Sequence, residues 1–309
     1  MISIIIPVYN SEDSIRKLIE EIIKSLKNNY SFEILLINDS SQDNTHQICV
    51  ELTNDYNFIN YLELSNNFGE HNAVMAGLNN CVGDYAVIMD DDFQNSSDSL
   101  LKLINYGLEN KNEFDVVYTK YKNKKDGFFR NAGSKFNDLI ANIILKKSKD
   151  LYLSSFKLIN RFLIDQINIH KSPYVYIDGV IHQITNKISY VEVEHETRKK
   201  GKSGYTITKL IQLWLRMFTG FSILPLRISS IIGVIITFFG IILGFITFFE
   251  RIFNNSIPSG YASLIIVSII FSGSILIALG LIGEYIGRIF LTINKKPQYV
   301  IKNQIKKKN

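Results

Sequence analysis

The sequence predicts an α/β protein in which an open, mostly parallel sheet is followed by an interfacial helix and a hairpin of two membrane-spanning helices. Three observations lead to this prediction. Short β-branched runs alternate with segments of helical period over the first part of the chain. Clusters of polar residues directly follow several of those runs. After about residue 205 the chain becomes strongly apolar and contains two uncharged runs, each roughly the 20 residues that a membrane span needs.

The first 90 residues hold four strand candidates separated by three helix candidates. The strand candidates are the runs Ile2–Val8, Phe32–Asn38, Ile59–Leu64 and Tyr85–Met89. The helix candidates are Asp13–Leu26, Asp43–Leu52 and Glu70–Asn80. Strands that alternate with helices pair in parallel, and such sheets bind ligands beyond the carboxyl ends of their strands. The polar clusters fall at those ends, which predicts a ligand site there.

The middle of the chain is less regular. The region 114–205 is rich in lysine around residues 120–125, and it contains a helix candidate near Ser134–Leu145 and a strand candidate at Ser189–Val193. The amphipathic segment Thr206–Phe221 stands directly before the first apolar run. This position favours a helix lying in the membrane interface, over about residues 206–226, and an ordinary core helix is the alternative.

Two apolar runs, Ile228–Phe249 and Ala262–Ile282, predict a helical hairpin through a membrane. Arg227 precedes the first run, and a tail rich in lysine (residues 291–309) follows the second. Because basic residues flank spans on the cytoplasmic side, both termini are expected in the cytoplasm of a cell with a plasma (inner) membrane. The predicted division is a catalytic domain at 1–205, the interfacial helix at 206–226, the hairpin at 227–290 and the tail at 291–309.

The composition narrows the class of protein further. Two cysteines, Cys49 and Cys81, are too few for a disulfide framework and too far apart for a metal knuckle, which favours a reducing compartment. The net charge of +5 comes largely from the basic tail, which next to a membrane span suits anionic lipid better than nucleic acid. The N-terminus has no basic leader, so a secretory signal is not expected.

The sharpest local signal is the acidic run Asp90-Asp91-Asp92, which directly follows the fourth strand candidate. Three adjacent carboxylates repel one another unless a cation compensates them. Hard oxygen ligands suit Mg²⁺ or Mn²⁺, and such an ion could bridge the phosphates of a nucleotide diphosphate. An acidic turn on a solvated surface is the alternative, although the position at the end of a buried strand favours a site.

Taken together, the motifs resemble those of family 2 glycosyltransferases with the GT-A fold. The resemblance lies in Ile5–Asn10, Ile37–Asp43, Asn67–Gly69, Ala76–Leu78 and Asp90–Gln94. It extends through Arg198–Ser203, Pro225–Arg227, Leu281–Arg288 and Lys296–Val300 to the branch of polyprenyl-phosphate glycosyltransferases of the GtrB/ArnC type, which are related to dolichol-phosphate mannose synthase. It therefore covers nearly the whole chain.

This resemblance implies roles for individual residues. The nucleotide-sugar would be held by Pro7, Tyr9, Asp39, Asp90 and Asp91. The catalytic residues would be Asp90, Asp92 and Arg198, with Arg198 reaching the donor phosphates and the metal held by Asp92 and Gln94. The acceptor phosphate would be bound by Arg130, Ser134 and Lys157, the last standing where the family usually has arginine. The resemblance also implies a homo-oligomer.

The implied reaction transfers a sugar from a UDP- or GDP-linked donor to undecaprenyl or a similar polyprenyl phosphate, with inversion at the anomeric carbon. A phosphate monoester is largely dianionic at neutral pH, so this acceptor needs no catalytic base. Two alternatives stay open. One is transfer to a glycan hydroxyl with Asp178 as base, and the other is an inactive membrane scaffold. The sugar, the lipid length and the downstream use in glycan, lipid A or protein glycosylation are not predicted.

One departure from the family pattern concerns the second strand end. Ser40 replaces the glycine that is common after the aspartate there. We therefore expect a turn that is less strained or differently shaped at this position.

Overall fold

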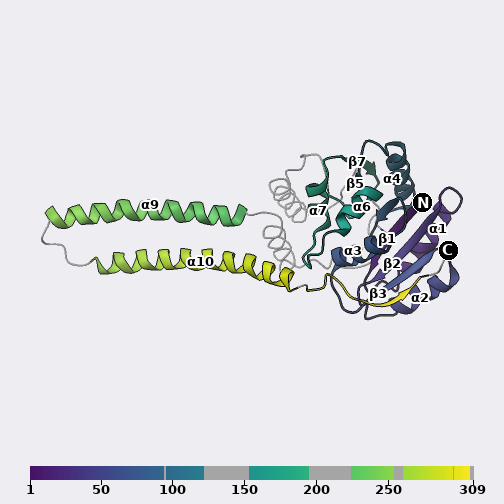
Figure 1. Cartoon of the computed structure of the whole chain (residues 1–309), viewed down its shortest axis with the longest axis horizontal. Helices are drawn as coiled ribbons and strands as arrows, with labels where there is room; N and C mark the ends of the chain where they lie inside the picture. The colour runs from purple at the N-terminus through teal and green to yellow at the C-terminus, as the bar shows by residue number, and fades with distance from the viewer. Residues whose placement is uncertain (94, 122–152, 195–223, 254–259, 295, 307–309) are drawn as a thin grey trace. The chain divides into compact units, whose positions relative to one another are not determined.

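A computed structural model describes residues 1–93, 95–121, 153–194, 224–253, 260–294 and 296–306 (Figure 1). The chain divides into two compact units. The first comprises Met1–Tyr205 together with Lys296–Asn309, and the second comprises Thr206–Lys295. The predicted interfacial helix at 206–226 falls almost wholly outside the described residues, and so does the helix candidate near Ser134–Leu145.

The first unit is an α/β domain built on an eight-stranded sheet. Its strands are β1 (Ile2–Val8), β2 (Phe32–Asn38), β3 (Ile59–Leu64), β4 (Tyr85–Ile88), β5 (Val116–Tyr121), β6 (Lys157–Asn160), β7 (Ile188–Val193) and β8 (Ile301–Ile305). Its helices are α1 (Ile15–Leu26), α2 (Thr45–Asp55), α3 (Glu70–Asn80), α4 (Ser97–Glu109), α6 (Arg161–Asn168) and α7 (Ile177–Ile184).

The strands lie in the order β7-β5-β6-β4-β1-β2-β3-β8. The four central strands β4, β1, β2 and β3 are parallel to one another, as the alternation of strands and helices predicts. On one side β6 joins β4 antiparallel, and β5 and β7 follow it. On the other side β8 joins β3 antiparallel. The sheet is therefore mixed, with a parallel centre.

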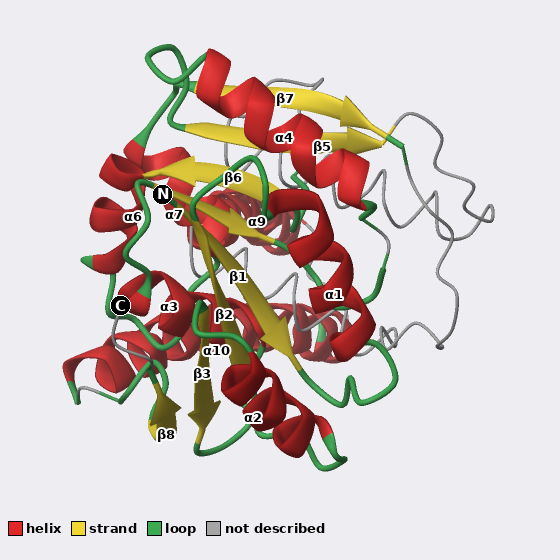
Figure 2. Ribbon diagram, turned by 90° about the vertical axis from the view of Figure 1, so that its right-hand side faces the viewer, coloured by secondary structure: helices red, strands yellow, loops and turns green. Residues whose placement is uncertain are grey.

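Helices cover both faces of this sheet (Figure 2). Helices α1, α2 and α4 pack together on one face, while α3, α6 and α7 lie on the other. Successive residues of a strand point to opposite faces, so Ile4 and Ile6 of β1 join the core under α1, whereas Ile5 faces α3. Helix α3 approaches closely because Gly77 has no side chain: a Cβ there would lie 2.4 Å from Ile5 Cγ2.

The last strand corrects one expectation about the C-terminus. The region 291–309 is predicted as a basic tail, yet Ile301–Ile305 forms β8 and belongs to the first unit. Lys302 of this strand binds the Glu63 carboxylate at 2.8 Å. That lysine is therefore held by the sheet edge. Lys296 and Lys306 remain exposed.

The second unit contains two long helices, α9 (Leu224–Phe253) and α10 (Tyr261–Ile293). They contact each other where Gly240 meets the ring of Phe271. Within α10, Phe271–Leu291 has a mean hydropathy of 1.7 and no buried residues, and in the described part of the chain it alone is long and apolar enough to cross a membrane. The apolar side chains of Leu276 and Ile277 are 68% and 67% exposed. In α9 the corresponding stretch, Ile231–Ile242, is shorter.

Candidate active site at the carboxyl ends of the central strands

The predicted polar clusters meet at one edge of the sheet. Because β4, β1, β2 and β3 are neighbours and parallel, their carboxyl ends point to the same edge. The segments that follow them are therefore adjacent: Tyr9–Asp13 after β1, Asp39–Asn44 after β2, Ser65–Gly69 after β3 and Asp90–Asp92 after β4. This confirms the prediction that the polar residues gather at strand ends.

Hydrogen bonds join the segments after β1 and β2 into one rim. The backbone N–H of Asn10 donates to Ser41 Oγ at 3.0 Å, and the N–H of Gln42 donates back to Asn10 Oδ1 at 2.8 Å. A second reciprocal pair links Glu12 to the start of α2, since Glu12 N–H donates to Asp43 and Asn44 N–H donates to Glu12. The two segments therefore hold each other in place before any ligand binds.

Left-handed backbone conformations are concentrated at this edge. Asn10, Ser40 and Phe93 have φ of 53°, 61° and 59°, and Gly69 has φ of 88°. The expectation for Ser40 was wrong, because this serine adopts the conformation that a glycine would take. The turn thus carries strain, which for a non-glycine residue costs roughly 1–2 kcal/mol. Strained backbone of this kind is typical of functional sites.

Asp39, a predicted nucleotide-binding residue, is 4% exposed at the end of β2. Its two carboxylate oxygens accept the N–H groups of Phe68 at 2.7 Å and Gly69 at 2.8 Å. Burial raises the pKa of Asp39, and these two hydrogen bonds oppose the rise. The aspartate therefore fixes the segment after β3 against the end of β2.

Two further predicted nucleotide-binding residues, Pro7 and Tyr9, lie on or just after β1. Pro7 is in the strand itself, in register with Ile37 of β2. Tyr9 follows the strand with its side chain 48% exposed, so its ring is available to a ligand. Its backbone N–H donates to the Asp91 carboxylate, and the Ser11 hydroxyl donates to the same group. Asp91 is thereby tied to the segment after β1.

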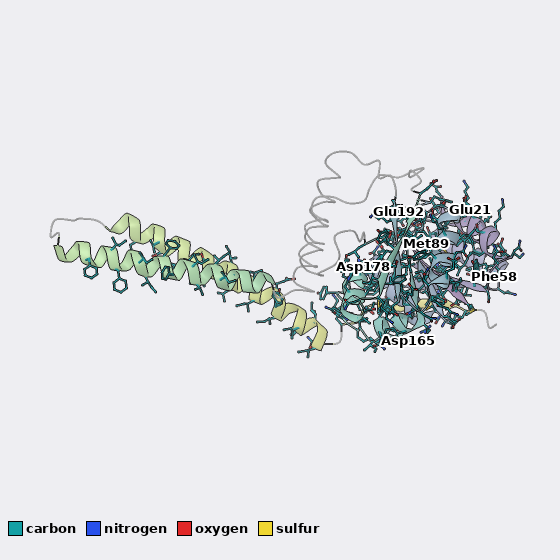
Figure 3. All side chains as sticks on the ribbon, turned by 90° about the horizontal axis from the view of Figure 1, so that it is seen from above. Glu21, Phe58, Met89, Asp165, Asp178 and Glu192 are labelled. Carbon is teal, nitrogen blue, oxygen red and sulfur yellow. The ribbon has the colours of Figure 1, made fainter. Side chains whose placement is uncertain are left out.

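The acidic run begins after Met89, a core residue that is 1% exposed (Figure 3). Burial, with the charges of Glu70 and Asp92, raises the pKa of Asp90 to about 7, against the opposing effects of a 2.5 Å hydrogen bond from Ser155 and the charge of Lys157. Burial likewise raises the pKa of Asp91 to about 6. The pKa values of Asp90 and Asp91 are therefore raised because these carboxyl groups are buried beside other carboxylates.

Glu70, the first residue of α3, adds a further carboxylate to this site that the sequence does not reveal. Its charge acts on Asp90, while its own side chain stays exposed to solvent, which screens part of the repulsion. A glutamate at the start of a helix ordinarily indicates only a favourable interaction with the helix dipole. Its closeness to Asp90 depends on how β4 and α3 are placed by the sheet.

The donor atoms at this site suit a hard divalent cation. Asp90, Asp91, Asp92 and Glu70 offer carboxylate oxygens, the ligands that Mg²⁺ and Mn²⁺ prefer, and the raised pKa values of Asp90 and Asp91 indicate negative charge that a cation would compensate. Among the residues that the structure describes, no three His, Cys, Asp or Glu side chains already converge as a metal cage. Gln94, the predicted second ligand, lies outside the described residues.

Lys157 and Asp178 form a buried ion pair close to the acidic run. Lys157, the first residue of β6, is 3% exposed. Asp178 in α7, which Figure 3 labels, is 6% exposed. The Tyr118 hydroxyl donates to Asp178 at 2.9 Å, and the Lys157 ammonium lies 5.1 Å from the centre of the Tyr118 ring. Burial opposes ionisation of Asp178, but the Lys157 charge and these hydrogen bonds lower its pKa below the usual value.

Lys157 is thus buried and paired with Asp178, whereas a phosphate-binding residue is expected to be accessible to its ligand. The remaining predicted basic and polar site residues, Arg130, Ser134 and Arg198, lie outside the described residues. The roles of these four side chains stay predictions.

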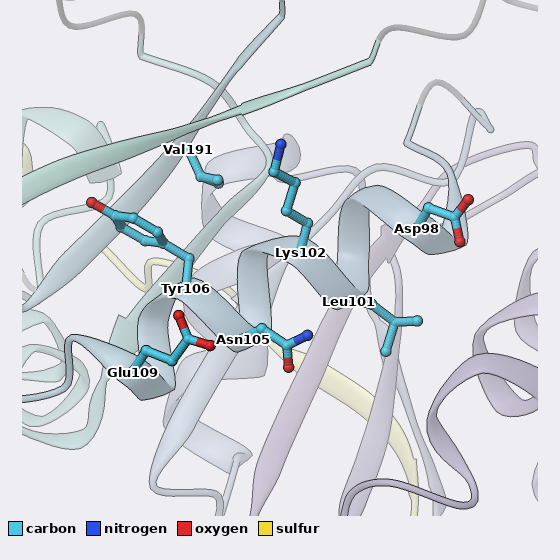
Figure 4. Close-up of a pocket in the computed structure, with 7 residues that line it drawn as sticks. All are labelled: Asp98, Leu101, Lys102, Asn105, Tyr106, Glu109 and Val191. Atoms are coloured by element: carbon cyan, nitrogen blue, oxygen red, sulfur yellow. The ribbon is translucent and has the colours of Figure 1, made fainter.

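An open hollow of about 410 Å³ lies elsewhere, along the outer side of α4 (Figure 4). It is lined by Asp98, Leu101, Lys102, Asn105, Tyr106, Glu109 and Val191. These residues come from one helix and the edge strand β7, away from the carboxyl ends of the parallel centre. The hollow contains none of the acidic cluster, so we place the candidate active site at the strand ends.

Comparison with known proteins shows the family to which the chain belongs. Residues 3–167 match the family model described as glycosyl transferase family 2. The chain is 31% identical to an undecaprenyl-phosphate 4-deoxy-4-formamido-L-arabinose transferase of Proteus mirabilis (strain HI4320), over 98% of this chain and 94% of the relative. It is 29% identical to an uncharacterised glycosyltransferase of Bacillus subtilis (strain 168), over 97% and 92% of the two chains.

Among solved structures, the chain resembles glucosyl-3-phosphoglycerate synthase from Mycobacterium tuberculosis, crystallised with Mn²⁺, UDP and phosphoglyceric acid. The TM-score is 0.55 at 14% identity, over 71% of this chain and 76% of that one. At this level of identity the likeness concerns the fold, and it confirms the predicted α/β sheet of the GT-A type.

Proposed function

Because the chain belongs to glycosyl transferase family 2, we propose that it transfers a sugar from a nucleotide diphosphate sugar to a polyprenyl phosphate, with inversion at the anomeric carbon. The observation that carries this proposal is the full-length similarity to relatives named as undecaprenyl-phosphate sugar transferases, two of which are 31% and 30% identical over 98% of this chain. The similarity includes the C-terminal helices as well as the α/β domain, which favours the lipid acceptor over a soluble one.

The donor is proposed to bind at the rim formed by the segments after β1 and β2. Tyr9 offers an exposed ring against which a base can stack, and Asp39 marks the end of the neighbouring strand. Asp91, the middle residue of the acidic run, joins the run to this rim, since it accepts hydrogen bonds from Tyr9 and Ser11. A nucleotide at the rim would thus direct its phosphates toward Asp90 and Asp92.

Asp92 and Gln94, with Asp90 beside them, are proposed to hold one Mg²⁺ or Mn²⁺ ion. When bound, the ion supplies Lewis-acid stabilisation of the diphosphate that leaves the sugar. The carboxylates would hold the ion and, through it, this end of the donor. Arg198 is proposed to add positive charge at the same phosphates.

The acceptor phosphate is proposed to be its own nucleophile. It is largely dianionic at neutral pH, because its second pKa is about 6. The state of Asp178 supports a mechanism without a base: its carboxylate accepts hydrogen bonds from both Lys157 and Tyr118, and its pKa is lowered. A carboxylate held in this way is a weak proton acceptor. Arg130 and Ser134 are proposed to bind the acceptor phosphate, with Lys157 contributing positive charge behind the site.

We further propose that α9 and α10 both cross the plasma membrane and that both chain ends face the cytoplasm. Strand β8 follows α10 yet pairs with β3, which precedes α9 in the chain, so the segments before and after the two helices lie in one sheet. Residues of one sheet are on one side of a membrane, and the chain must therefore cross an even number of times. A homo-oligomer in the membrane is part of the same proposal.

The proposal is tested with the purified full-length protein in detergent, undecaprenyl phosphate and a panel of UDP- and GDP-sugars that includes UDP-4-deoxy-4-formamido-L-arabinose. The expected product is one polyprenyl-phosphate sugar, detected by mass spectrometry and lost when EDTA removes the metal. Asp92→Ala is the inactive control. Absence of a lipid-linked product with every donor would exclude the lipid acceptor, and label appearing in an oligosaccharide instead would favour the glycan alternative.

A further inference from the structure

The C-terminal segment, residues 296–305, begins three residues after α10 ends and is bound to the α/β domain along its length. Near its start, the buried side chain of Gln298 donates to the Ser172 carbonyl at 2.9 Å. Further on, β8 pairs antiparallel with β3. Two series of contacts lead from this segment to Asp39, the proposed donor-binding residue.

The first series runs along the backbone after β3. The Val300 carbonyl accepts the N–H of Ser65 at 2.8 Å, and Ser65 opens the segment that ends at Gly69. The N–H groups of Phe68 and Gly69 are the two that bind the Asp39 carboxylate. The C-terminal segment therefore fixes the beginning of the short loop whose end fixes Asp39.

The second series runs through side chains. Glu63 of β3 accepts hydrogen bonds from Lys302 at 2.8 Å and Asn303 at 3.2 Å, and it lies 3.7 Å from the His46 ring. A hydrogen bond of 2.7 Å joins His46 Nδ1 and the Tyr61 hydroxyl. The Asn38 amide then donates to the Tyr61 hydroxyl at 2.9 Å, and the Ser41 N–H donates to Asn38 Oδ1 at 2.9 Å. Asn38 and Ser41 flank Asp39 on both sides. The series thus ends at the strained turn that contains Ser40.

We propose that the C-terminal segment is a positioning element of the donor site: through Glu63 and the loop after β3, it holds the Asp39 turn in the shape that binds the nucleotide. The proposal rests on the assignment of the nucleotide to the Asp39 rim. No residue of the segment needs to contact the donor. The alternative is that β8 only covers an exposed sheet edge, which would affect stability and leave nucleotide affinity unchanged.

The two roles are separated by the double variant Lys302→Ala/Asn303→Ala, which removes both hydrogen bonds to Glu63 and leaves the backbone pairing of β8 intact. Lys306→Ala is the matched control. It also removes one lysine charge close to β8, but the structure describes no side-chain contact for Lys306. The full-length protein in detergent is titrated with UDP and, separately, GDP in the presence of Mn²⁺. Thermal unfolding is recorded for each variant.

We expect the double variant to weaken binding of the preferred nucleotide about three- to ten-fold, the range for loss of a coupled hydrogen-bonded contact. The KM for the nucleotide-sugar should rise by the same factor, while the KM for polyprenyl phosphate stays constant. Lys306→Ala should bind like the wild type, and Lys302→Arg/Asn303→Gln should restore part of the affinity. Unchanged nucleotide affinity in the double variant, with or without a lower melting temperature, would overturn the proposal.

A second variant tests the contacts through Tyr61 and leaves the C-terminal segment unchanged. Tyr61→Phe removes the hydroxyl that links His46 to Asn38, and it should also weaken nucleotide binding. Because both variants act on one series of contacts, their effects should be less than additive when combined. Fully additive effects would contradict the proposed connection. Nucleotide binding is measured without the acceptor, so a protein that binds nucleotide but makes no lipid product refutes the lipid acceptor and leaves this test intact.

Discussion

The Lys157 ammonium and the Asp178 carboxylate pair with each other inside the α/β domain, and both side chains are almost completely shielded from water. Lys157 also acts electrostatically on Asp90, the first residue of the acidic run. Asp178, the base of the alternative mechanism, is therefore linked through Lys157 to the charges of the proposed metal site. It also accounts for the low pKa of Asp178.

Asp178→Asn tests whether a base is needed. The asparagine keeps an oxygen that can accept hydrogen bonds from Tyr118 and Lys157, and it removes the negative charge. We expect a lower melting temperature and a kcat within about ten-fold of the wild type, since loss of a true general base costs about 10²- to 10⁴-fold. A fall of that size at an unchanged melting temperature would favour the hydroxyl acceptor.

The variant Lys157→Met tests how much the Lys157–Asp178 ion pair contributes to the folding stability of the domain. Leaving Asp178 charged and unpaired in the interior should destabilise the domain by about 3–5 kcal/mol. The double variant Lys157→Met/Asp178→Leu removes both charges and should recover much of this loss. Thermal unfolding of the three proteins measures the difference. If the double variant is no more stable than the single one, packing and not charge dominates at this position.

Stability without metal should fall as the pH rises from about 4 to about 7. Asp90 and Asp91 have pKa values raised to about 7 and about 6, so in this window the folded protein retains protons that the unfolded chain has lost. The stabilising contribution is complete at low pH and is lost once the pH passes the folded pKa. Mn²⁺ should therefore raise the melting temperature more at pH 8 than at pH 5.5. An equal rise in melting temperature with Mn²⁺ at both pH values would contradict this prediction.

Ser40→Gly should make the protein more stable. Ser40 has φ of 61°, a conformation that glycine adopts without steric strain. Part of the gain is offset by the greater freedom of glycine in the unfolded chain, so we expect a net gain of about 0.5–1 kcal/mol. Ser40→Ala is the matched control and should show no gain, because alanine meets the same steric conflict. The measurement is the melting temperature of each variant relative to the wild type.

Asp39→Asn should weaken nucleotide binding and lower stability together. Both oxygens of Asp39 accept N–H groups, and asparagine would place an NH₂ group against one of these donors. The loss of one hydrogen bond and the resulting repulsion should lower stability by about 1–3 kcal/mol. Asp13→Asn, an exposed aspartate after β1, is the control. Wild-type affinity for both UDP and GDP in Asp39→Asn would remove this residue from the donor site.

The parallel centre of the sheet could be predicted because the hydrophobic pattern within each segment indicates whether it forms a strand or a helix. The bounds of β1, β2, β3 and α3 agree with the predicted segments, since buried strands and amphipathic helices each carry a distinct hydrophobic period. The gathering of polar residues at one edge followed from the parallel order. Strand β8 was missed for the opposite reason: Ile301–Ile305 has three exposed polar residues and is held largely by backbone pairing to β3.

The electrostatic partners within the site could not be predicted from the sequence. Lys157 and Asp178 are 21 positions apart and meet because β6 and α7 pack near each other, and Glu70 reaches Asp90 from a different helix. Such pairs depend on tertiary packing and leave no periodic signal. The conformation of Ser40 is not predictable from its residue type, because hydrogen bonds among the surrounding residues hold the turn.

The position of β8 also bears on how a soluble enzyme could be made. Ending the chain before α9 would remove the helices and, with them, the edge strand and the residues bound to Glu63. A water-soluble form should instead be an internal deletion, in which a flexible linker replaces residues 206–295 and residues 296–309 are kept. A Gly/Ser linker reaches roughly 5–6 Å times the square root of its length, so its length can be varied until β8 pairs again. In the sequence, the unit of α9 and α10 is thus an insertion within the α/β domain.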